Sequence, residues 1–238
     1  MTNITLVGTV HSDFKGPERL RKILRFYRDP VIALESTPED AQEAKEKIVG
    51  HRRLIEDTIK KNKGMFTEEQ IASLRAYVNS YVYESNIPYD FQKQNQDALV
   101  VSVGVVVENL DKWMEVKVSE YISSGGDVSR LTGMNNPTIE DLLANGIEVY
   151  QRAIDQAYAQ DGSGFMKELM GEIFPYLTDK RDKIFAERIR ELRKEHSERE
   201  VVGIFGNMHV FGKYEGNLYE QLSDLNPTRV RLNEADNF

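Results

Sequence analysis

The chain has 238 residues and a formal net charge of −8, and its 40% hydrophobic and 29% charged residues are ordinary for a globular protein. The acidic balance and the lack of a basic stripe argue against a nucleic-acid partner. There is no cysteine, which excludes disulfides, thiolate ligands and a cysteine nucleophile and is typical of a cytoplasmic protein. Any metal site would therefore use nitrogen and oxygen ligands.

The apolar segments do not have the pattern of a membrane span or a secretory leader. The longest nearly unbroken apolar run, residues 98–107, is about half the length of a transmembrane helix. The first residues enter a strand pattern without the basic and apolar regions of a signal peptide. We therefore predict no membrane segment in this chain and a cytoplasmic location.

The first part of the chain predicts a β-α-β unit. Residues 4–10 have the apolar, β-branched pattern of a buried strand, and a helix is expected to start near Pro17. A second buried strand, residues 31–34, ends at Glu35. Such a crossover makes the two strands parallel and usually neighbours, so His11 and Glu35 are expected at the same edge of the sheet.

The middle of the chain is predicted to be mostly helical. Long helices are expected at residues 37–63 and 67–82, and residues 87–91 are interpreted as a short third strand. Residues 97–197 are interpreted as a helical insertion or cap, although the β-branched residues near its start also allow a strand. Helices are predicted there over residues 98–121, 137–158, 165–174 and 178–196.

The last part of the chain predicts a second β-α-β unit. Residues 201–205 form a buried apolar run that leads into a loop at 206–212, followed by a helix at 214–222 and a strand at 228–232.

These elements predict one α/β domain over residues 1–238, in which two β-α-β halves share a largely parallel sheet and bracket the helical residues 97–197. The sequence leaves the sheet order and the oligomeric state open, a homo-oligomer included.

Two of the four histidines occupy the same sequence setting. His11 and His209 each stand three residues after a glycine, Gly8 and Gly206, at the end of an apolar run. Because ligands of open parallel sheets bind beyond the carboxyl ends of the strands, both imidazoles could meet Glu35. Two imidazoles and a carboxylate are a standard ligand set of catalytic metals, so we predict that His11, Glu35 and His209 bind a divalent metal.

Each of these assignments has a structural alternative. The glycines can simply permit tight turns, and Glu35 can cap the helix that follows its strand. Asn207 could polarise a substrate carbonyl or act as a turn residue. Arg181 falls within the apolar stripe of the 178–196 helix, where it needs a partner. It is therefore either a structural ion pair or a clamp for developing negative charge.

Other polar residues carry less specific expectations. Asp13 could orient the imidazole of His11 as a hydrogen-bond partner, or it could be an ordinary loop aspartate. Arg188, on the same helix as Arg181, is interpreted as structural. His51 and His196 lie in charged helical stretches and are expected to be exposed.

Four motifs in this order resemble the TraB/PrgY family, which belongs to a wider group with the TIKI metalloproteases, the GumN-like proteins and, more remotely, the erythromycin-esterase and ChaN-like proteins. The motifs are LVGTVH at residues 6–11, VIALES at 31–36, the helix start Lys180-Arg181-Asp182, and GIFGNMHVFG at 203–212. The resemblance implies an α/β fold of two related halves with the active site where they meet. It also implies a divalent-metal-dependent peptidase in which His11, Glu35 and His209 are essential and Arg181 matches the arginine of the late helix.

The resemblance also bears on substrate and location. TraB/PrgY proteins are associated with shutting down peptide pheromones, which implies a peptide substrate. The chain departs from many relatives because Ser36 follows Glu35 where an aspartate is common, and because the C-terminal membrane segment of many TraB proteins is missing. Erythromycin-esterase relatives hydrolyse an ester with a histidine base and no metal, and ChaN-like relatives bind haem.

We therefore expect a hydrolase, in first place a peptidase or amidase that depends on Mn²⁺, Co²⁺ or Zn²⁺ and acts on a peptide or small molecule. Glu35 would be the third ligand or the general base, and Arg181 with Asn207 would stabilise the oxyanion. One alternative is metal-independent hydrolysis with a histidine base oriented by Glu35. Another is a non-catalytic regulatory protein that binds a peptide, or binds haem through His209 or Tyr214.

Overall fold

The structure is a computed structural model that describes residues 3–11, 13–62, 64–80, 82–105, 110–125, 142, 145–159, 163–171 and 174–238. The strands are β1 (Ile4–Thr9), β2 (Val31–Leu34), β3 (Leu99–Ser102), β4 (Val201–Gly206) and β5 (Thr228–Arg231). The helices are α1 (Gly16–Leu24), α2 (Pro38–Lys61), α3 (Glu68–Ser80), α4 (Tyr83–Gln94), α5 (Leu110–Ser123), α7 (Ile147–Ala159), α8 (Ser163–Met170), α9 (Phe174–Leu177), α10 (Asp179–Glu195), α11 (Asn207–Phe211) and α12 (Leu218–Gln221). The 3₁₀ helices are η3 (Ser223–Leu225) and η4 (Leu232–Asn237).

The five strands form one parallel sheet in the order β3-β2-β4-β1-β5, which confirms the predicted α/β class. The sequence led us to expect that β1 and β2 are neighbours in the sheet. They are not, because β4 lies between them. The connection from β4 to β5 likewise passes over β1. The two β-α-β halves are therefore interleaved. As a result, the strands that precede His11 and His209 are adjacent, with Thr9 paired to Gly206.

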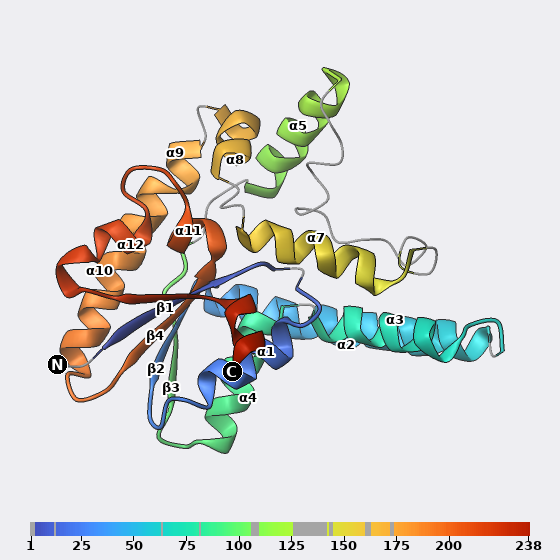
Figure 1. Cartoon of the computed structure of the whole chain (residues 1–238), viewed down its shortest axis with the longest axis horizontal. Helices are drawn as coiled ribbons and strands as arrows, with labels where there is room; N and C mark the ends of the chain where they lie inside the picture. Colours follow the sequence, from blue (N-terminus) through green and yellow to red (C-terminus); the bar gives the residue numbers. More distant parts are fainter. Residues whose placement is uncertain are drawn as a thin grey trace.

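Both faces of the sheet are covered by helices, which explains the near-continuous apolar runs of its central strands. In β2, Ile32 and Leu34 face an apolar core that includes residues of α1, α4 and α7. Val31 and Ala33 face a second core formed with α10, α11 and α12. Figure 1 shows α10 and α12 on one side of the sheet and α1 and α4 on the other.

Helices α2 and α3 form a long hairpin that projects away from the sheet (Figure 1). The predicted start of α3 is confirmed by a capping box, in which the backbone N–H of Gln70 donates to Thr67 Oγ1 at 3.1 Å and that of Thr67 donates to Gln70 Oε1 at 2.9 Å. The two helices bury Ile55, Leu74 and Val78 between them. The hairpin is inserted between β2 and α4.

The predicted third strand is wrong in position. Residues 87–91 belong to α4, whose Tyr83 and Ile87 recur at helical spacing and are buried in the core with α1. Pro88 is accommodated inside this helix without ending it. The third strand is Leu99–Ser102, at the start of the segment predicted to be helical, where β-branched residues pair with β2.

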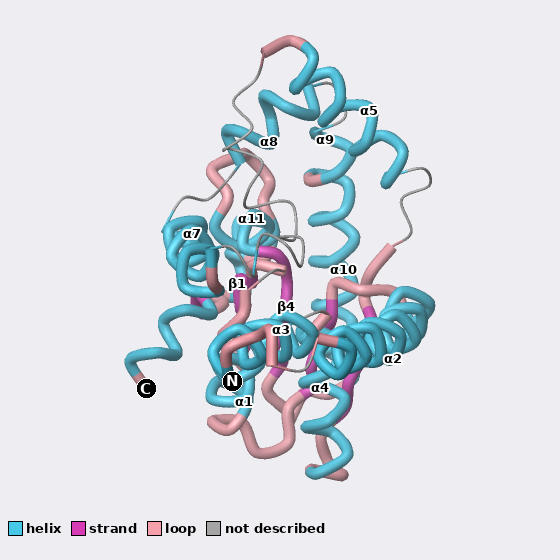
Figure 2. The backbone as a smooth tube through the Cα atoms, turned by 90° about the vertical axis from the view of Figure 1, so that its right-hand side faces the viewer, coloured by secondary structure: helices cyan, strands magenta, loops and turns pink. Residues whose placement is uncertain are grey.

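Helices α5, α8 and α9 lie above the C-terminal edge of the sheet (Figures 1 and 2). They share an apolar cluster with Met208 of α11 and with Tyr214. Parts of the helices predicted over 98–121, 137–158 and 165–174 lie outside the described residues, namely 106–109, 137–141, 143–144 and 172–173. The assignment of 97–197 to one insertion remains a prediction. Within the described part of the chain, no helix has the length and apolar character needed to cross a membrane.

Two boundaries near the end also differ from expectation. The predicted loop at 206–212 contains the short helix α11, because Gly206 takes an extended conformation and the chain then turns at once into helix, which buries Val210 and Phe211. The predicted 214–222 helix is reduced to α12, whose start is capped by the Asn217 side chain.

Candidate functional site

The candidate site lies at the C-terminal edge of the sheet, where β1, β2 and β4 end beside one another. Glu35 directly follows β2, and His11 lies two residues beyond β1. His209 lies on α11, which begins directly after β4. The strand geometry therefore brings the three predicted residues to the edge where open parallel sheets bind ligands.

Glu35 is the centre of a network of hydrogen bonds and ion pairs. Its Oε1 accepts a hydrogen bond from Arg181 at 2.7 Å and lies 3.3 Å from His209 Nε2, and its Oε2 accepts from the backbone N–H of Gly206 at 2.7 Å. Burial alone would raise the pKa of Glu35, but His209 and Arg181 outweigh it and hold this pKa well below its usual range. Glu35 is therefore a carboxylate at neutral pH.

His209 is buried, with 4% of its side chain exposed, and both ring nitrogens face carboxylates. Nδ1 lies 2.5 Å from Asp182 Oδ1, opposite the Nε2 contact with Glu35. The ring also meets Phe185 edge-on. Burial alone would lower the pKa of His209, but Glu35 and Asp182 raise it to about 9.

Asp182 links His209 to Tyr214. It is fully buried in the first turn of α10, and its second carboxylate oxygen accepts a hydrogen bond from the Tyr214 hydroxyl. Burial and the charge of Asp182 raise the pKa of Tyr214, so its hydroxyl remains a donor. The four residues Tyr214, Asp182, His209 and Glu35 form a continuous chain of polar contacts that fixes the imidazole in place.

His11 is paired with a residue that the sequence did not indicate. Its Nδ1 lies 2.6 Å from Glu84 Oε2, at the start of α4, and Glu84 raises the pKa of His11. The His11 side chain is 73% exposed, so solvent screens this pair more than it screens the pair of His209 and Asp182.

The three predicted ligands converge on one point beside Gly206. A Cβ atom placed on this glycine would lie 3.4 Å from Glu35 Oε2, 3.5 Å from His209 Cδ2 and 3.9 Å from His11 Nε2. These distances are ordinary van der Waals contacts, so the space between the three side chains is about the size of a methyl group. The glycine lets a small group lie against the sheet edge between both imidazoles and the carboxylate.

Arg181 and Asn207, the two residues predicted to stabilise an oxyanion, have different surroundings. Besides its bond to Glu35, the Arg181 guanidinium lies over the ring of Phe185, and its Nε is buried without a hydrogen-bond partner. Asn207 is buried, and its Oδ1 also lacks a partner and packs towards Gly8 of β1, 2.9 Å from the position of a Cβ there. Arg181 thus belongs to the Glu35 network, whereas the Asn207 oxygen faces β1.

Four other residues that the sequence analysis considered lie outside the network around Glu35. Asp13 does not orient His11; it is fully buried and bonded to Arg19, among others. Arg188 donates to the backbone oxygen of Gly104 at 3.0 Å, a structural contact as expected. The other two histidines, His51 on α2 and His196 after α10, are half-buried, not fully exposed as expected.

Sequence reasoning missed Asp182 and Glu84, the carboxylates that hold the two imidazoles. Asp182 could have been found, because it lies in the same apolar stripe of α10 as Phe185 and Ile189, where a charged residue needs a partner. Glu84 carries no such signal, since its neighbours were interpreted as the approach to a strand. Its role emerges only from the packing of α4 against the loop after β1.

The donor atoms of the site do not form a ready-made metal cage. Within the part of the chain that the structure describes, no group of three or more His, Cys, Asp or Glu side chains is arranged to hold a metal ion. One oxygen of Glu35 is bonded to Arg181 and the other to Gly206, so the carboxylate is held by donors of the protein itself.

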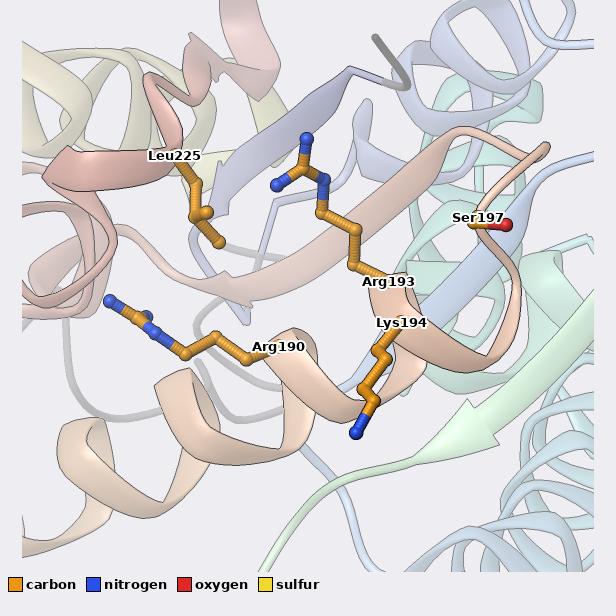
Figure 3. A pocket seen from close by; sticks show the side chains of 5 residues that line it. All are labelled: Arg190, Arg193, Lys194, Ser197 and Leu225. Atoms are coloured by element: carbon orange, nitrogen blue, oxygen red, sulfur yellow. The ribbon is translucent and has the colours of Figure 1, made fainter.

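A hollow of about 250 Å³ lies apart from this site, at the end of α10 (Figure 3). It is lined by Arg190, Arg193, Lys194, Ser197 and Leu225. Arg190 is already bonded to Asp224 and to the backbone oxygen of Gln221. Basic residues at a helix C-terminus also complement the helix dipole, so the hollow has a structural explanation and contains none of the predicted site residues.

The fold and the site define a class: an α/β protein with a five-stranded parallel sheet and, at the C-terminal edge of that sheet, a charged cluster built around Glu35, two carboxylate-paired imidazoles and an arginine. Comparisons with protein-family models, curated proteins and solved structures gave no match to this chain. We therefore infer the function from the site and from the motif resemblance.

The raised pKa of His209 predicts a stability that falls with increasing pH. A histidine whose pKa is about 9 when folded and about 6.5 when unfolded stabilises the fold fully below pH 6.5, and this contribution is lost as the pH rises through 9. In metal-free protein, the difference in unfolding free energy between wild type and His209→Gln should shrink between about pH 6.5 and 9.5. Urea unfolding at several pH values measures it, and a difference that does not change with pH contradicts the prediction.

Proposed function

We propose that this chain is a hydrolase, in first place a divalent-metal-dependent peptidase or amidase of TraB/TIKI type that acts on a peptide. The observation that carries the proposal is the convergence of His11, Glu35 and His209 on the space beside Gly206. Groups of these types at one strand-end edge supply metal ligands, a general base and charge stabilisation.

The donor set suits a divalent metal in the chemical type of its ligands, two imidazoles and a carboxylate. Glu84 holds Nδ1 of His11 and Asp182 holds Nδ1 of His209, which is the hydrogen-bond arrangement of metal-ligating histidines. Nε2 of His209 lies 3.3 Å from Glu35 Oε1, so it would have to exchange this contact for the metal. With Glu35 as the third ligand, the set suits Zn²⁺ and also Mn²⁺ or Co²⁺. A bound metal would polarise the scissile carbonyl and lower the pKa of water.

The remaining steps fall to residues of the chain. As the alternative to its role as third ligand, Glu35 can be the general base, because its carboxylate is charged and lies beside the shared space. Arg181 lies next to it with an unpaired Nε and would stabilise the oxyanion, with Asn207 proposed as a second donor. The apolar cluster of α5, α8 and α9 includes Met208, which precedes His209, and Tyr214, which is bonded to Asp182, so it would exclude water beside His209.

The direct test is hydrolysis of a set of peptides and esters by purified protein in chelator and then with Mn²⁺, Co²⁺ or Zn²⁺. We expect peptide cleavage that a chelator abolishes and added metal restores, and metal retained by the wild type but not by His209→Ala. Full activity in chelator would remove the metal from the mechanism. No hydrolysis with any metal would contradict the hydrolase proposal.

A variant of Gly206 tests the site within the same experiment. Gly206→Ala places a methyl group between the three side chains in a backbone conformation that alanine adopts without strain. Turnover should fall by about tenfold or more while thermal stability is retained. Gly50→Ala is the matched control, because nothing lies within 4 Å of its added methyl group on α2. Equal activity of the two variants would place the site elsewhere.

Metal-free hydrolysis is the second candidate, and the bonding of Glu35 favours it. Arg181 and the backbone N–H of Gly206 already donate hydrogen bonds to the Glu35 carboxylate. The negative charge of Glu35 is therefore stabilised without a metal ion. His11, oriented by Glu84, would then be the base, and because Glu84 raises its pKa to about 9, this version requires activity that increases as the pH rises towards 9. His11→Ala should abolish turnover without changing metal content, and turnover that persists would exclude this version.

The haem-binding alternative has less support in the described residues. Both ring nitrogens of His209 face carboxylates, and the Tyr214 hydroxyl is bonded to Asp182, so either ligand would have to leave its partner to reach iron. A Soret band on haem titration that is lost in His209→Ala would establish this reading.

A further inference from the structure

The α2–α3 hairpin leaves and re-enters the fold beside the candidate site. It starts just after Glu35 and Ser36, and the chain returns to the body of the protein at Glu84 and Ser85 in the first turn of α4. The hydroxyl oxygens of Ser36 and Ser85 lie 3.1 Å apart, within hydrogen-bond distance. The hairpin ends are thus joined, and each end carries a carboxylate that faces an imidazole of the site.

Glu84 differs from an ordinary surface partner of a histidine in its burial and in its hydrogen bonds. Its side chain is mostly buried, and Oε2 lies 2.6 Å from His11 Nδ1. The second oxygen, Oε1, is buried without a hydrogen-bond partner. Leaving a carboxylate oxygen unsatisfied costs free energy, and such a group in a folded protein needs an explanation.

The backbone before Glu84 is strained. Val82 has φ 49° and ψ 32°, a left-handed conformation that is rare for a β-branched residue. The next residue, Tyr83, is held firmly, because its hydroxyl donates to the backbone oxygen of Val10 at 3.1 Å and its ring packs closely on Gly16. The start of α4 is therefore fixed to the loop that carries His11, and the strain persists because these contacts determine the backbone.

We propose that Glu84 is the positioning residue of His11: its carboxylate fixes the ring orientation and tautomer so that Nε2 points to the space shared with Glu35 and His209. An imidazole as exposed as that of His11 would otherwise sample several rotamers. Asp182 performs the same task for the buried His209. The catalytic consequence rests on the proposed function, whereas the orientation of the ring does not.

The first experiment needs neither metal nor substrate. In ¹⁵N-histidine-labelled protein, with His11→Ala to assign the signals, the Nδ1–H proton of His11 should be shifted downfield and slowed in exchange by the bond to Glu84. Glu84→Ala should remove this signature, and Glu84→Gln, which keeps an acceptor, should retain part of it. Asp90→Ala, an exposed carboxylate on the same helix, is the control and should leave it unchanged. An unchanged His11 signature in folded Glu84→Ala would overturn the proposal.

The second experiment measures the consequence for the site. Glu84→Ala should weaken Mn²⁺ or Zn²⁺ binding about 10- to 100-fold and lower kcat with little change in KM, with Glu84→Gln in between and Asp90→Ala like wild type. Circular dichroism checks that each variant is folded. If wild type neither binds metal nor hydrolyses peptides, the proposed function fails while the NMR result still decides the role of Glu84. If Glu84→Ala bound metal as tightly as the wild type and had the same kcat, the positioning role would be overturned.

Discussion

Asp182→Asn is expected to lower turnover by about 10²- to 10⁴-fold and to leave the fold intact, by the same tautomer effect that operates when a histidine-orienting aspartate is replaced in a serine-protease triad. Asparagine has the shape of aspartate, and its oxygen can still accept from the Tyr214 hydroxyl. Its amide N–H₂ group would face His209 Nδ1 and turn that atom into an acceptor. The neutral ring would then keep its proton on Nε2, towards Glu35, instead of on Nδ1, so the nitrogen that would bind the metal or accept a proton would be blocked.

Two controls separate this effect from a general loss of polar contacts. Tyr214→Phe removes the other hydrogen bond of Asp182 without changing the tautomer of His209, so turnover should fall less than about tenfold. Asp179→Asn makes the same charge change in the same turn of α10 at an exposed position. Peptide hydrolysis and thermal unfolding should be measured for all three variants. Wild-type turnover in Asp182→Asn would show that His209 takes no part in the reaction.

The strands could be predicted from the sequence where both of their faces are buried. In β1, β2 and β4, both faces of each strand pack on helices, so the residues are apolar without a break and differ in pattern from the surrounding helices. β3 is an edge strand whose residues are only half-buried, and it was absorbed into a predicted helix. The strand order could not be predicted, because the local sequences of β1 and β4 contain no signal that the two β-α-β halves interleave.

The interleaving changes the meaning of the two Gly-x-x-His motifs. Each motif begins within the end of a central strand, and these strands are neighbours, so both histidines lie beside Gly206. The halves then diverge. β4 passes directly into α11, which buries His209 against Phe185, whereas β1 continues into a loop that leaves His11 exposed. Equal motifs therefore lead to one rigidly enclosed imidazole and one that depends on a partner from α4.

The site residues that sequence analysis found share one property: each follows a strand or interrupts an apolar stripe. His11, Glu35 and His209 satisfy the first condition, and Arg181 satisfies the second. Of the two carboxylates that hold the imidazoles, Asp182 also interrupts the apolar stripe of α10, whereas Glu84 has no such sequence signal. Glu84 follows a helical hairpin inserted after β2, so only the folded chain brings it to His11.

Asp13→Ala is expected to destabilise the protein by about 3–5 kcal/mol, because it leaves a buried guanidinium without its buried partner. Arg19 is 2% exposed and donates to Asp13 Oδ2 at 2.9 Å, to Asp155 at 2.9 Å and to Asp236 at 2.9 Å. Asp13 also accepts from the Tyr158 hydroxyl at 2.8 Å and from Gln151 Nε2 at 3.0 Å. The network joins the loop after β1 to α1, α7 and the C-terminal η4.

The expected loss is larger for Asp13 than for the other carboxylates of this network. Asp155 and Asp236 are partly exposed, so water can replace either of them, and Asp236→Ala should cost about 1 kcal/mol or less. Asp13 is fully buried, and water cannot take its place beside Arg19 without opening the contact between α1 and α7. Urea unfolding of both variants gives the comparison. Equal losses would mean that Arg19 is held by its exposed partners and that the loop of His11 is anchored by other contacts, such as that between Tyr83 and Val10.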